Sequence, residues 1–551
     1  MKKLVLTFLF ALLQVVSVFP QVMFVDRFEV PGNFFDKDFL VIPRSGGLIA
    51  FRVQPEKGLN FKGNLQYFLT DFNLKSDSFK EIRVKDGYDL VGYDLEGDYL
   101  YILMQKGSVS TSERYLIEID LKSEVAKEIP LENIYAMELQ EFFVLNRSAI
   151  FMGNADLRPI VQILDILENN VITVQGIYFK DTKILQLKKE SELGLLDLLV
   201  SRRDKYKMKQ ISLMTFDENG NKIREVVIEK LEDQDMELVE GIMTPIQNYQ
   251  QSIIGTFGNR KREAYQGIYL GDINEFGEYK FKYLTLENFP NFFNYMKEKQ
   301  KEKKLQELEK SFAKGKTPSI KPVFSAREVL TLDQGYLVYS DHFLATNPRY
   351  MQRDGVYANE AYRYSANRLM MDQLGYGFGR YGNSFPGSRF GTSTSWQEQG
   401  EYEFVSSYFL YLNRDGEVIW DNALDLLFTS TYNPGKYGEV SFDGEKLHFM
   451  YLDVNDIKIY MSYIKNGEVV FQNKTFEIEL INEEERIRET QNASLSLKHW
   501  YSNYFLLMGK QKIRYLNDEK REQIKDVFFL TKIKVDGDLY VPEEGENLGK
   551  D

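Results

Sequence analysis

The chain has 551 residues, and its 82 acidic side chains outnumber its 69 lysines and arginines, which gives a formal net charge of −13 at pH 7. A surface this acidic repels polyanions, which argues against DNA, RNA or heparin as the main partner. The sequence has no cysteine and three histidines. It therefore excludes disulfides, thiol catalysis and thiolate metal sites, and it makes a histidine-rich metal centre a poor expectation.

The first residues have the pattern of a secretory signal peptide. Lys2 and Lys3 form a short basic segment, and residues 4–13 form an apolar segment of the usual length. We therefore predict a signal peptide over residues 1–21 and export to the bacterial periplasm or cell surface. An uncleaved membrane anchor is the alternative, but the apolar segment is short for one, and no later segment is apolar enough to span a bilayer.

From residue 22 onward, apolar and polar residues alternate along short segments with the period of a β-strand. Many of these segments adjoin an Asp-Gly or Asn-Gly pair, which favours a tight hairpin turn because both central residues adopt positive φ. Such pairs occur at Asp86-Gly87, Asn219-Gly220, Asp415-Gly416, Asp443-Gly444, Asn466-Gly467 and Asp536-Gly537. Helical periodicity is nearly absent, so we predict an all-β fold.

The strands group into about eight units of similar length. The units span residues 34–89, 90–133, 134–178, 179–234, 235–289, 323–428, 429–482 and 485–541. Most have the length of a four-stranded blade, so we predict a single β-propeller domain over residues 22–541 with seven or eight blades, followed by an acidic tail at 542–551. A pair of tandem β-sandwich domains would give similar hairpins and remains the alternative.

Two insertions interrupt the sixth unit, and the first is a charged helical insertion at residues 291–316. We predict a helix over residues 291–314, because Pro290 precedes it and Gly315 follows it at the C′ position. Its apolar face is formed by Phe292, Met296, Leu305, Leu308 and Phe312. Because charged residues fill its middle, we expect a solvated surface helix, and the alternative is a helix that docks a partner.

The second insertion, residues 347–400, is rich in tyrosine, arginine and glycine and contains no lysine. Tyrosine, tryptophan and arginine dominate binding interfaces, and arginine favours stacking and bidentate recognition. The predicted binding residues are Arg349, Tyr350, Tyr357, Tyr362, Arg363, Tyr364, Arg368, Tyr376, Arg380, Tyr381 and Trp396. A loop of this length also fits a self-packing lid or a disordered segment.

Several motifs match a known site only in part. Residues 377–382 satisfy G-x-G-x-x-G, but neither the preceding strand nor the following helix of a dinucleotide site is present. Residues 314–317 lack the upstream glycine of a phosphate-binding loop, and residues 217–228 lack the glutamate that closes a calcium loop. The histidines, His342, His448 and His499, are too far apart for a local zinc site. We therefore predict no cofactor and no metal.

These patterns favour a non-enzymatic binding or scaffold protein of the cell envelope that uses the 347–400 insertion to bind a protein partner or a glycan. One alternative is a propeller-fold polysaccharide hydrolase or lyase, whose carboxylates would come from different strands. No G-x-S-x-G motif is present, which disfavours a serine hydrolase of that class. Another alternative is an accessory component of an outer-membrane export or assembly complex.

Overall fold

The computed structural model describes residues 21–55, 63–76, 79–107, 113–203, 209–228, 236–259, 264–321, 323–345, 402–431, 436–517 and 519–540. The predicted signal peptide and acidic tail therefore lie almost wholly outside the described residues. The chain divides into two compact units, one made of Met1–Phe34 and Gly438–Asp551 and the other of Phe35–Tyr437.

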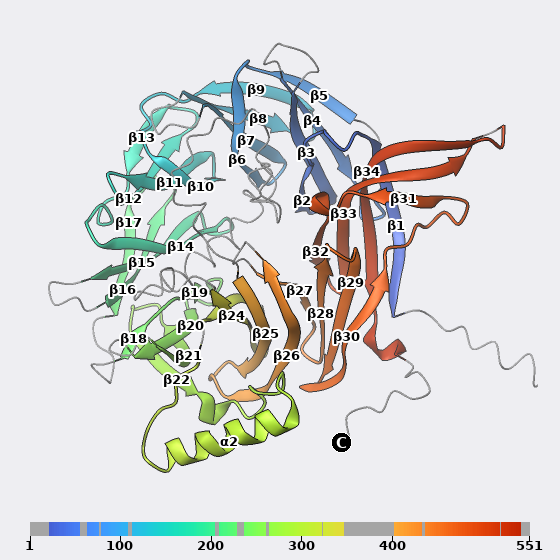
Figure 1. Cartoon of the computed structure of the whole chain (residues 1–551). Coiled ribbons are helices and arrows are strands. Elements are labelled where there is room, and N and C mark those ends of the chain that lie inside the picture. The colour runs from blue at the N-terminus through green and yellow to red at the C-terminus, as the bar shows by residue number, and fades with distance from the viewer. Residues whose placement is uncertain are drawn as a thin grey trace, which may run out of the picture. The chain divides into compact units, whose positions relative to one another are not determined.

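The unit Phe35–Tyr437 contains six antiparallel sheets, blades 1 to 6, in which successive strands pair with their neighbours (Figure 1). Blade 1 consists of β2 (Leu40–Arg44), β3 (Gly47–Pro55), β4 (Gly63–Thr70) and β5 (Phe79–Val84). Blade 2 consists of β6 (Tyr88–Glu96), β7 (Tyr99–Lys106), β8 (Arg114–Asp120) and β9 (Val125–Pro130). Blade 3 consists of β10 (Glu138–Leu145), β11 (Ser148–Ala155), β12 (Arg158–Asp165) and β13 (Asn170–Thr173). Blade 4 consists of β14 (Thr182–Glu190), β15 (Leu195–Arg203), β16 (Lys209–Asp217) and β17 (Lys222–Ile228). Blade 5 consists of β18 (Met236–Leu238), β19 (Ile242–Met243), β20 (Gln251–Asn259), β21 (Ala264–Ile273) and β22 (Tyr279–Thr285). Blade 6 consists of β23 (Val323–Leu332), β24 (Gly335–Ala345), β25 (Tyr402–Asn413) and β26 (Val418–Thr431).

The unit formed by the two ends of the chain contains blades 7 and 8. Their strands are β27 (Glu439–Phe442), β28 (Lys446–Asp453), β29 (Lys458–Lys465) and β30 (Glu468–Glu477); and β31 (Arg486–Thr490), β32 (Ser496–Tyr501), β33 (Tyr504–Leu516) and β34 (Glu522–Val535) with β1 (Val22–Pro31). In blade 8, β31 and β32 both pair with β33, and β34 follows. The outermost strand on the other side is β1, which pairs with β34 along its whole length from Val22↔Val535 to Pro31↔Val527. The start of the chain thus completes the last blade.

The eight sheets formed by the described residues confirm the predicted β-propeller fold, whereas the predicted unit 429–482 starts before the end of β26 and the predicted unit 485–541 omits β1. Their core lies between successive blades. One buried cluster combines Phe51 and Tyr67 of blade 1 with Ile102 and Ile117 of blade 2, and similar clusters join each later pair of blades within a unit. The middle strands are therefore buried on both faces and read as continuous apolar runs, as β7 does.

Hairpin turns account for much of this agreement. Asn219-Gly220, Asp415-Gly416, Asp443-Gly444 and Asn466-Gly467 each connect two strands of one blade, whereas Asp86-Gly87 connects blade 1 to blade 2. In the Asn466-Gly467 turn both residues have positive φ, at 49° and 84°. Asp536-Gly537 is not a hairpin turn, because these residues cap and begin a short 3-10 helix, η4 (Gly537–Leu539), which follows the last strand.

The first strand of most blades contains a β-bulge that the sequence pattern did not reveal. The register with the second strand shifts at Leu90/Gly92, Leu139/Glu141, Ile184/Gln186, Ala326/Glu328 and Ile487/Glu489. In blade 5 the first strand is interrupted instead, and the chain between Leu238 and Ile242 has one residue more than the chain between their partners. A bulge re-aims the side chain of its extra residue. The extra residue in blade 6 is Arg327.

The predicted helix is shorter than expected. The structure has an α-helix only over Glu298–Phe312 (α2), whereas residues 291–297 form turns. The turn segment is anchored by Phe292 and Phe293, which are buried against blades 5 and 6 after the short helix η1 (Leu286–Asn288). α2 buries no residue fully, and only Leu305, Leu308 and Phe312 pack partly against the core. Gly315 has the positive φ expected of a residue that follows a helix.

Candidate functional site

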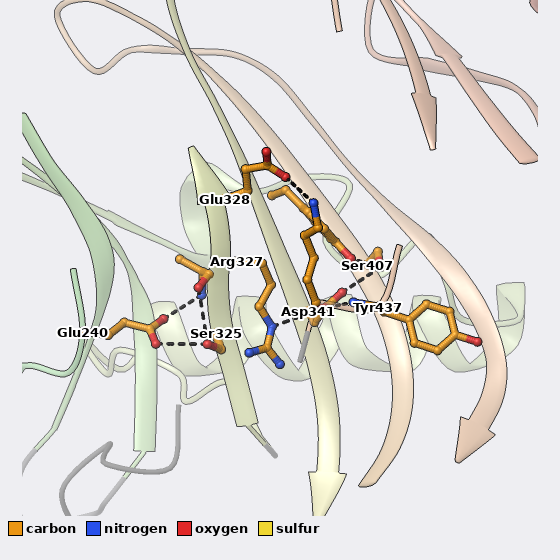
Figure 2. Close-up of polar contacts among 10 residues, drawn as sticks. Glu240, Ser325, Arg327, Glu328, Asp341, Ser407 and Tyr437 are labelled. Atoms are coloured by element: carbon orange, nitrogen blue, oxygen red, sulfur yellow. Dashed lines mark hydrogen bonds and ion pairs between the residues drawn. The ribbon is translucent and has the colours of Figure 1, made fainter. Parts of the chain in front are cut away.

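All eleven binding residues predicted in the 347–400 insertion lie outside the described residues. What the structure describes is the hairpin that carries the insertion. β24 and β25 of blade 6 remain paired up to Ala345↔Tyr402, so the insertion leaves and returns on adjacent strands. The part of blade 6 next to this point contains a network of buried polar side chains, which we call the blade 6 polar cluster; it comprises Glu240, Ser325, Arg327, Asp341 and Ser407 (Figure 2).

The centre of the cluster is a buried ion pair between β23 and β24. The Nε of Arg327 lies 3.1 Å from Oδ2 of Asp341, and neither side chain has any exposed area. Asp341 also accepts hydrogen bonds from Ser407 Oγ at 2.9 Å and from the backbone N–H of Tyr437 at 3.1 Å. The carboxylate therefore links β23, β24, β25 and the segment that follows β26.

Glu240, the second acid of the cluster, belongs to the interruption in the first strand of blade 5. Its carboxylate accepts hydrogen bonds from Thr256 Oγ1 at 3.0 Å, from Ser325 Oγ at 3.0 Å and from the backbone N–H of Ala326 at 2.6 Å. Burial raises the pKa of Glu240, while these donors and the nearby charge of Arg327 oppose the shift. Glu240, from the interrupted first strand of blade 5, and Arg327, the extra residue in the first strand of blade 6, therefore belong to the same polar cluster.

Aromatic rings cover one side of this network. The guanidinium carbon of Arg327 lies 4.8 Å from the centroid of the Phe343 ring. Phe404 stacks on Phe343 with centroids 5.1 Å apart, and Tyr437 lies 5.0 Å from Phe404. Next to them Lys436 pairs with Glu328 at 2.9 Å. Arg327 therefore has a carboxylate at its Nε and an apolar surface against its face.

The terminal nitrogens of Arg327 have no hydrogen-bond partner among the described residues. Nη1 and Nη2 are both buried, and no hydrogen-bond acceptor among the described residues reaches either of them. Burying polar hydrogens without acceptors is costly, and native proteins nearly always avoid it. The unused donors form the end of a planar fork, a shape that suits an oxyanion.

A second group of buried polar residues in blade 6 has a different role. Asp421 accepts hydrogen bonds from the backbone N–H of Asn291 at 3.1 Å and from Tyr408 Oη at 3.2 Å, and burial raises its pKa to about 6. His342 bonds the carbonyl of Lys321 at 2.8 Å, and burial lowers its pKa to about 4. The rings of Phe292 and Tyr295 lie against His342. These contacts fix the segment that leads into α2 onto blade 6.

Sequence reasoning missed the blade 6 polar cluster, although a signal for it was present. Arg327 stands within the strand 323–332 and Asp341 within the strand 335–345, and both strands consist mainly of apolar and small residues. A charge in the middle of a buried strand requires a partner. The pattern could not say which of the 82 acidic residues that partner is.

The described residues contain neither a cluster of metal ligands nor a helix that could span a membrane. Within the described ranges, no three His, Asp or Glu side chains lie close enough together to hold a metal ion. No helix in the same ranges is long and apolar enough to cross a membrane.

Comparisons with known proteins give a similarity of fold. No protein-family model matches the sequence, and no curated protein matches it significantly. Among solved structures, the chain is similar to the β-propeller domain of the Trilobed protease from Pyrococcus furiosus, with 7% identity over 80% of this chain and 98% of that domain and a TM-score of 0.32. It is also similar to the Dos1 propeller (8% identity, 81% and 92% covered, TM-score 0.36) and to the polysaccharide lyase Uly1 (9% identity, 81% and 90% covered, TM-score 0.35). At this level of identity the likeness concerns the β-propeller fold and assigns no activity.

Proposed function

We propose that this protein is an exported, non-enzymatic propeller of the bacterial cell envelope that binds a partner through its 347–400 insertion. The observation that carries the proposal is the way blade 6 holds the insertion. β24 and β25 are paired up to Ala345↔Tyr402. Both ends of an interface-rich sequence are therefore held at one place on a rigid scaffold, and long loops on rigid scaffolds commonly carry binding functions.

The composition of the insertion supports a protein partner first and a glycan second. Its six arginines are interleaved with tyrosines, without any lysine. Arginine and tyrosine supply large planar contact surfaces that become interface hot spots when they are desolvated. The leader indicates export, so the partner is expected in the periplasm or at the cell surface.

The test is affinity capture from cell-envelope extracts with the tagged mature protein and two variants. In the first variant an Asn-Gly turn replaces residues 346–401, which the pairing of Ala345 with Tyr402 should permit without loss of the fold. In the second variant the order of residues 347–400 is scrambled, so that the composition is kept. We expect the natural chain to retrieve a specific partner and both variants to fail to retrieve it.

The controls separate binding from folding and from nonspecific adhesion. Both variants should unfold cooperatively and keep the far-ultraviolet circular dichroism of the natural chain. A partner retained by the scrambled chain would indicate nonspecific adhesion and contradict the proposal. A natural chain that captures nothing and instead cleaves a polysaccharide would replace the binding role by an enzymatic one.

A further inference from the structure

Arg327 differs from other buried arginines of this chain in what its terminal nitrogens contact. In blade 1, Arg52 lies over the Phe39 ring at 4.3 Å, and its Nη1 donates to the carbonyl of Lys37 at 2.9 Å while its Nη2 faces Asp36. In blade 8, Arg27 donates from both terminal nitrogens, to Thr531 and Gln511. The fold therefore pairs the terminal nitrogens of these arginines, whereas Nη1 and Nη2 of Arg327 are buried without an acceptor in the part of the chain that the structure describes.

We propose that the two terminal nitrogens of Arg327 bind the carboxylate of a ligand whose adjoining part is apolar or aromatic. Nε is already used by Asp341, so the end of the fork presents Nη1 and Nη2 together. Two such donors match the two oxygens of a carboxylate. Arg327 would bind this group whether or not the insertion binds a partner.

The surroundings favour a carboxylate over a phosphate. Asp341 and Glu240 both lie close to Arg327, so a doubly charged anion would be repelled by two buried acids. A single negative charge is balanced more easily by the guanidinium. The rings of Phe343 and Phe404 next to the guanidinium supply an apolar surface for the rest of the ligand.

Access to the site follows from its burial. The side chain of Arg327 has no exposed area, so a ligand can reach it only when the residues that cover it move aside. Association should therefore be slow compared with binding at an open surface. A binding experiment must allow for this with long incubation.

The test uses the full mature chain and the probe 4-fluorobenzoate, followed by fluorine NMR after prolonged incubation. We expect a bound resonance for the natural chain and at least about a tenfold weaker affinity for Arg327→Lys, because a lysine loses the two-pronged geometry. Arg52→Lys is the matched control, since this arginine is also buried over a ring but has partners for its terminal nitrogens. It should bind as the natural chain does. The neutral probe 4-fluorobenzamide should bind more weakly than the acid.

A further variant identifies the source of the carboxylate. It replaces the acids of the insertion by amides, and these acids are Asp354, Glu360, Asp372 and Glu398. If the natural chain binds the probe, the acceptor is a separate ligand. If only the amide variant binds it, a carboxylate of the chain itself is the natural acceptor, and the proposal of a separate ligand is wrong.

Three further results would overturn the proposal. The proposal fails if neither chain binds the probe, if Arg327→Lys binds it as well as the natural chain, or if phenyl phosphate binds and 4-fluorobenzoate does not. Thermal unfolding without the probe shows whether Arg327→Lys is folded. If it is not, the double variant Arg327→Met with Asp341→Asn replaces it, because this variant removes both buried charges together.

Discussion

At the scale of single residues, the Arg327–Asp341 pair illustrates how this protein uses buried charge. Both side chains are fully buried, and the aspartate accepts hydrogen bonds from Ser407 and from the backbone N–H of Tyr437 in addition to its contact with Arg327. Such a pair gains little over a well-packed apolar pair, but it becomes very costly when one partner is removed. The pair therefore adds little to stability, and its main effect is to determine which strand segments lie next to each other.

Asp341→Ala should destabilise the protein by about 3–5 kcal/mol, because it leaves the charge of Arg327 buried and without its carboxylate. Urea unfolding at neutral pH measures this loss. Glu128→Ala is the control, since Glu128 pairs with Lys85 at 3.2 Å on the surface with both side chains 46% exposed, and such pairs contribute about 0–1 kcal/mol. Equal effects for the two variants would show that Arg327 finds another partner.

A second residue of consequence is His448 on β28. Its Nε2 accepts the backbone N–H of Gly537 at 3.0 Å, and its ring stacks on Tyr463 with centroids 4.8 Å apart. Burial lowers the pKa of His448 to about 4, against the opposing influence of Asp536, Asp443 and Asp538. The neutral imidazole thus holds η4 against blade 7, and protonation at Nε2 would break that hydrogen bond.

This shift predicts acid destabilisation in a defined window. The unfolded chain binds a proton at His448 near pH 6.5 and the folded chain only near pH 4, so the free energy of unfolding decreases as the pH falls between these values. From pH 7 to pH 5 we expect this histidine to account for about 2 kcal/mol. The measurement is chemical denaturation of the natural chain and of His448→Gln at both pH values. Identical pH dependence of the two proteins would refute the assignment.

At the scale of elements, β1 has the largest structural consequence. Without β1, the strand β34 of blade 8 would keep β33 but lose its partner on the other side, along the register from Val22↔Val535 to Pro31↔Val527. An unpaired strand edge exposes a row of backbone donors and acceptors and promotes association. The segment directly after the predicted leader therefore belongs to the fold and is not a linker.

A chain that lacks residues 22–31 should melt at a lower temperature and aggregate more readily, because the edge of β34 is then open. A synthetic peptide with the sequence of residues 22–31 should raise the melting temperature in a concentration-dependent way by adding the missing strand. Differential scanning fluorimetry measures both effects. A scrambled peptide serves as control, and stabilisation by it would mean that the pairing is not specific.

At the scale of the whole molecule, the repetition of hairpins explains why so much could be predicted. Turn chemistry and alternation act over a few residues, and they predicted the eight units from residues such as Asn466-Gly467. The helix was predicted too long because Phe292, which was assigned to its apolar face, is buried together with Phe293 as an anchor in a turn segment. The bulges were not predicted because a one-residue change of phase within a short, mostly apolar strand cannot be told from an ordinary irregularity of the pattern.

The sequence by itself determined the all-β class, an approximate number of repeats (seven or eight) and the place in the sixth unit where the repetition stops, because strand periodicity and turn preference are local properties. Only the tertiary structure decided that β1 completes blade 8 and that Glu240, Arg327, Asp341 and Ser407 meet in one cluster. Such contacts join residues far apart in the chain. They depend on strand register and on how neighbouring blades stack, and no local pattern specifies either of them.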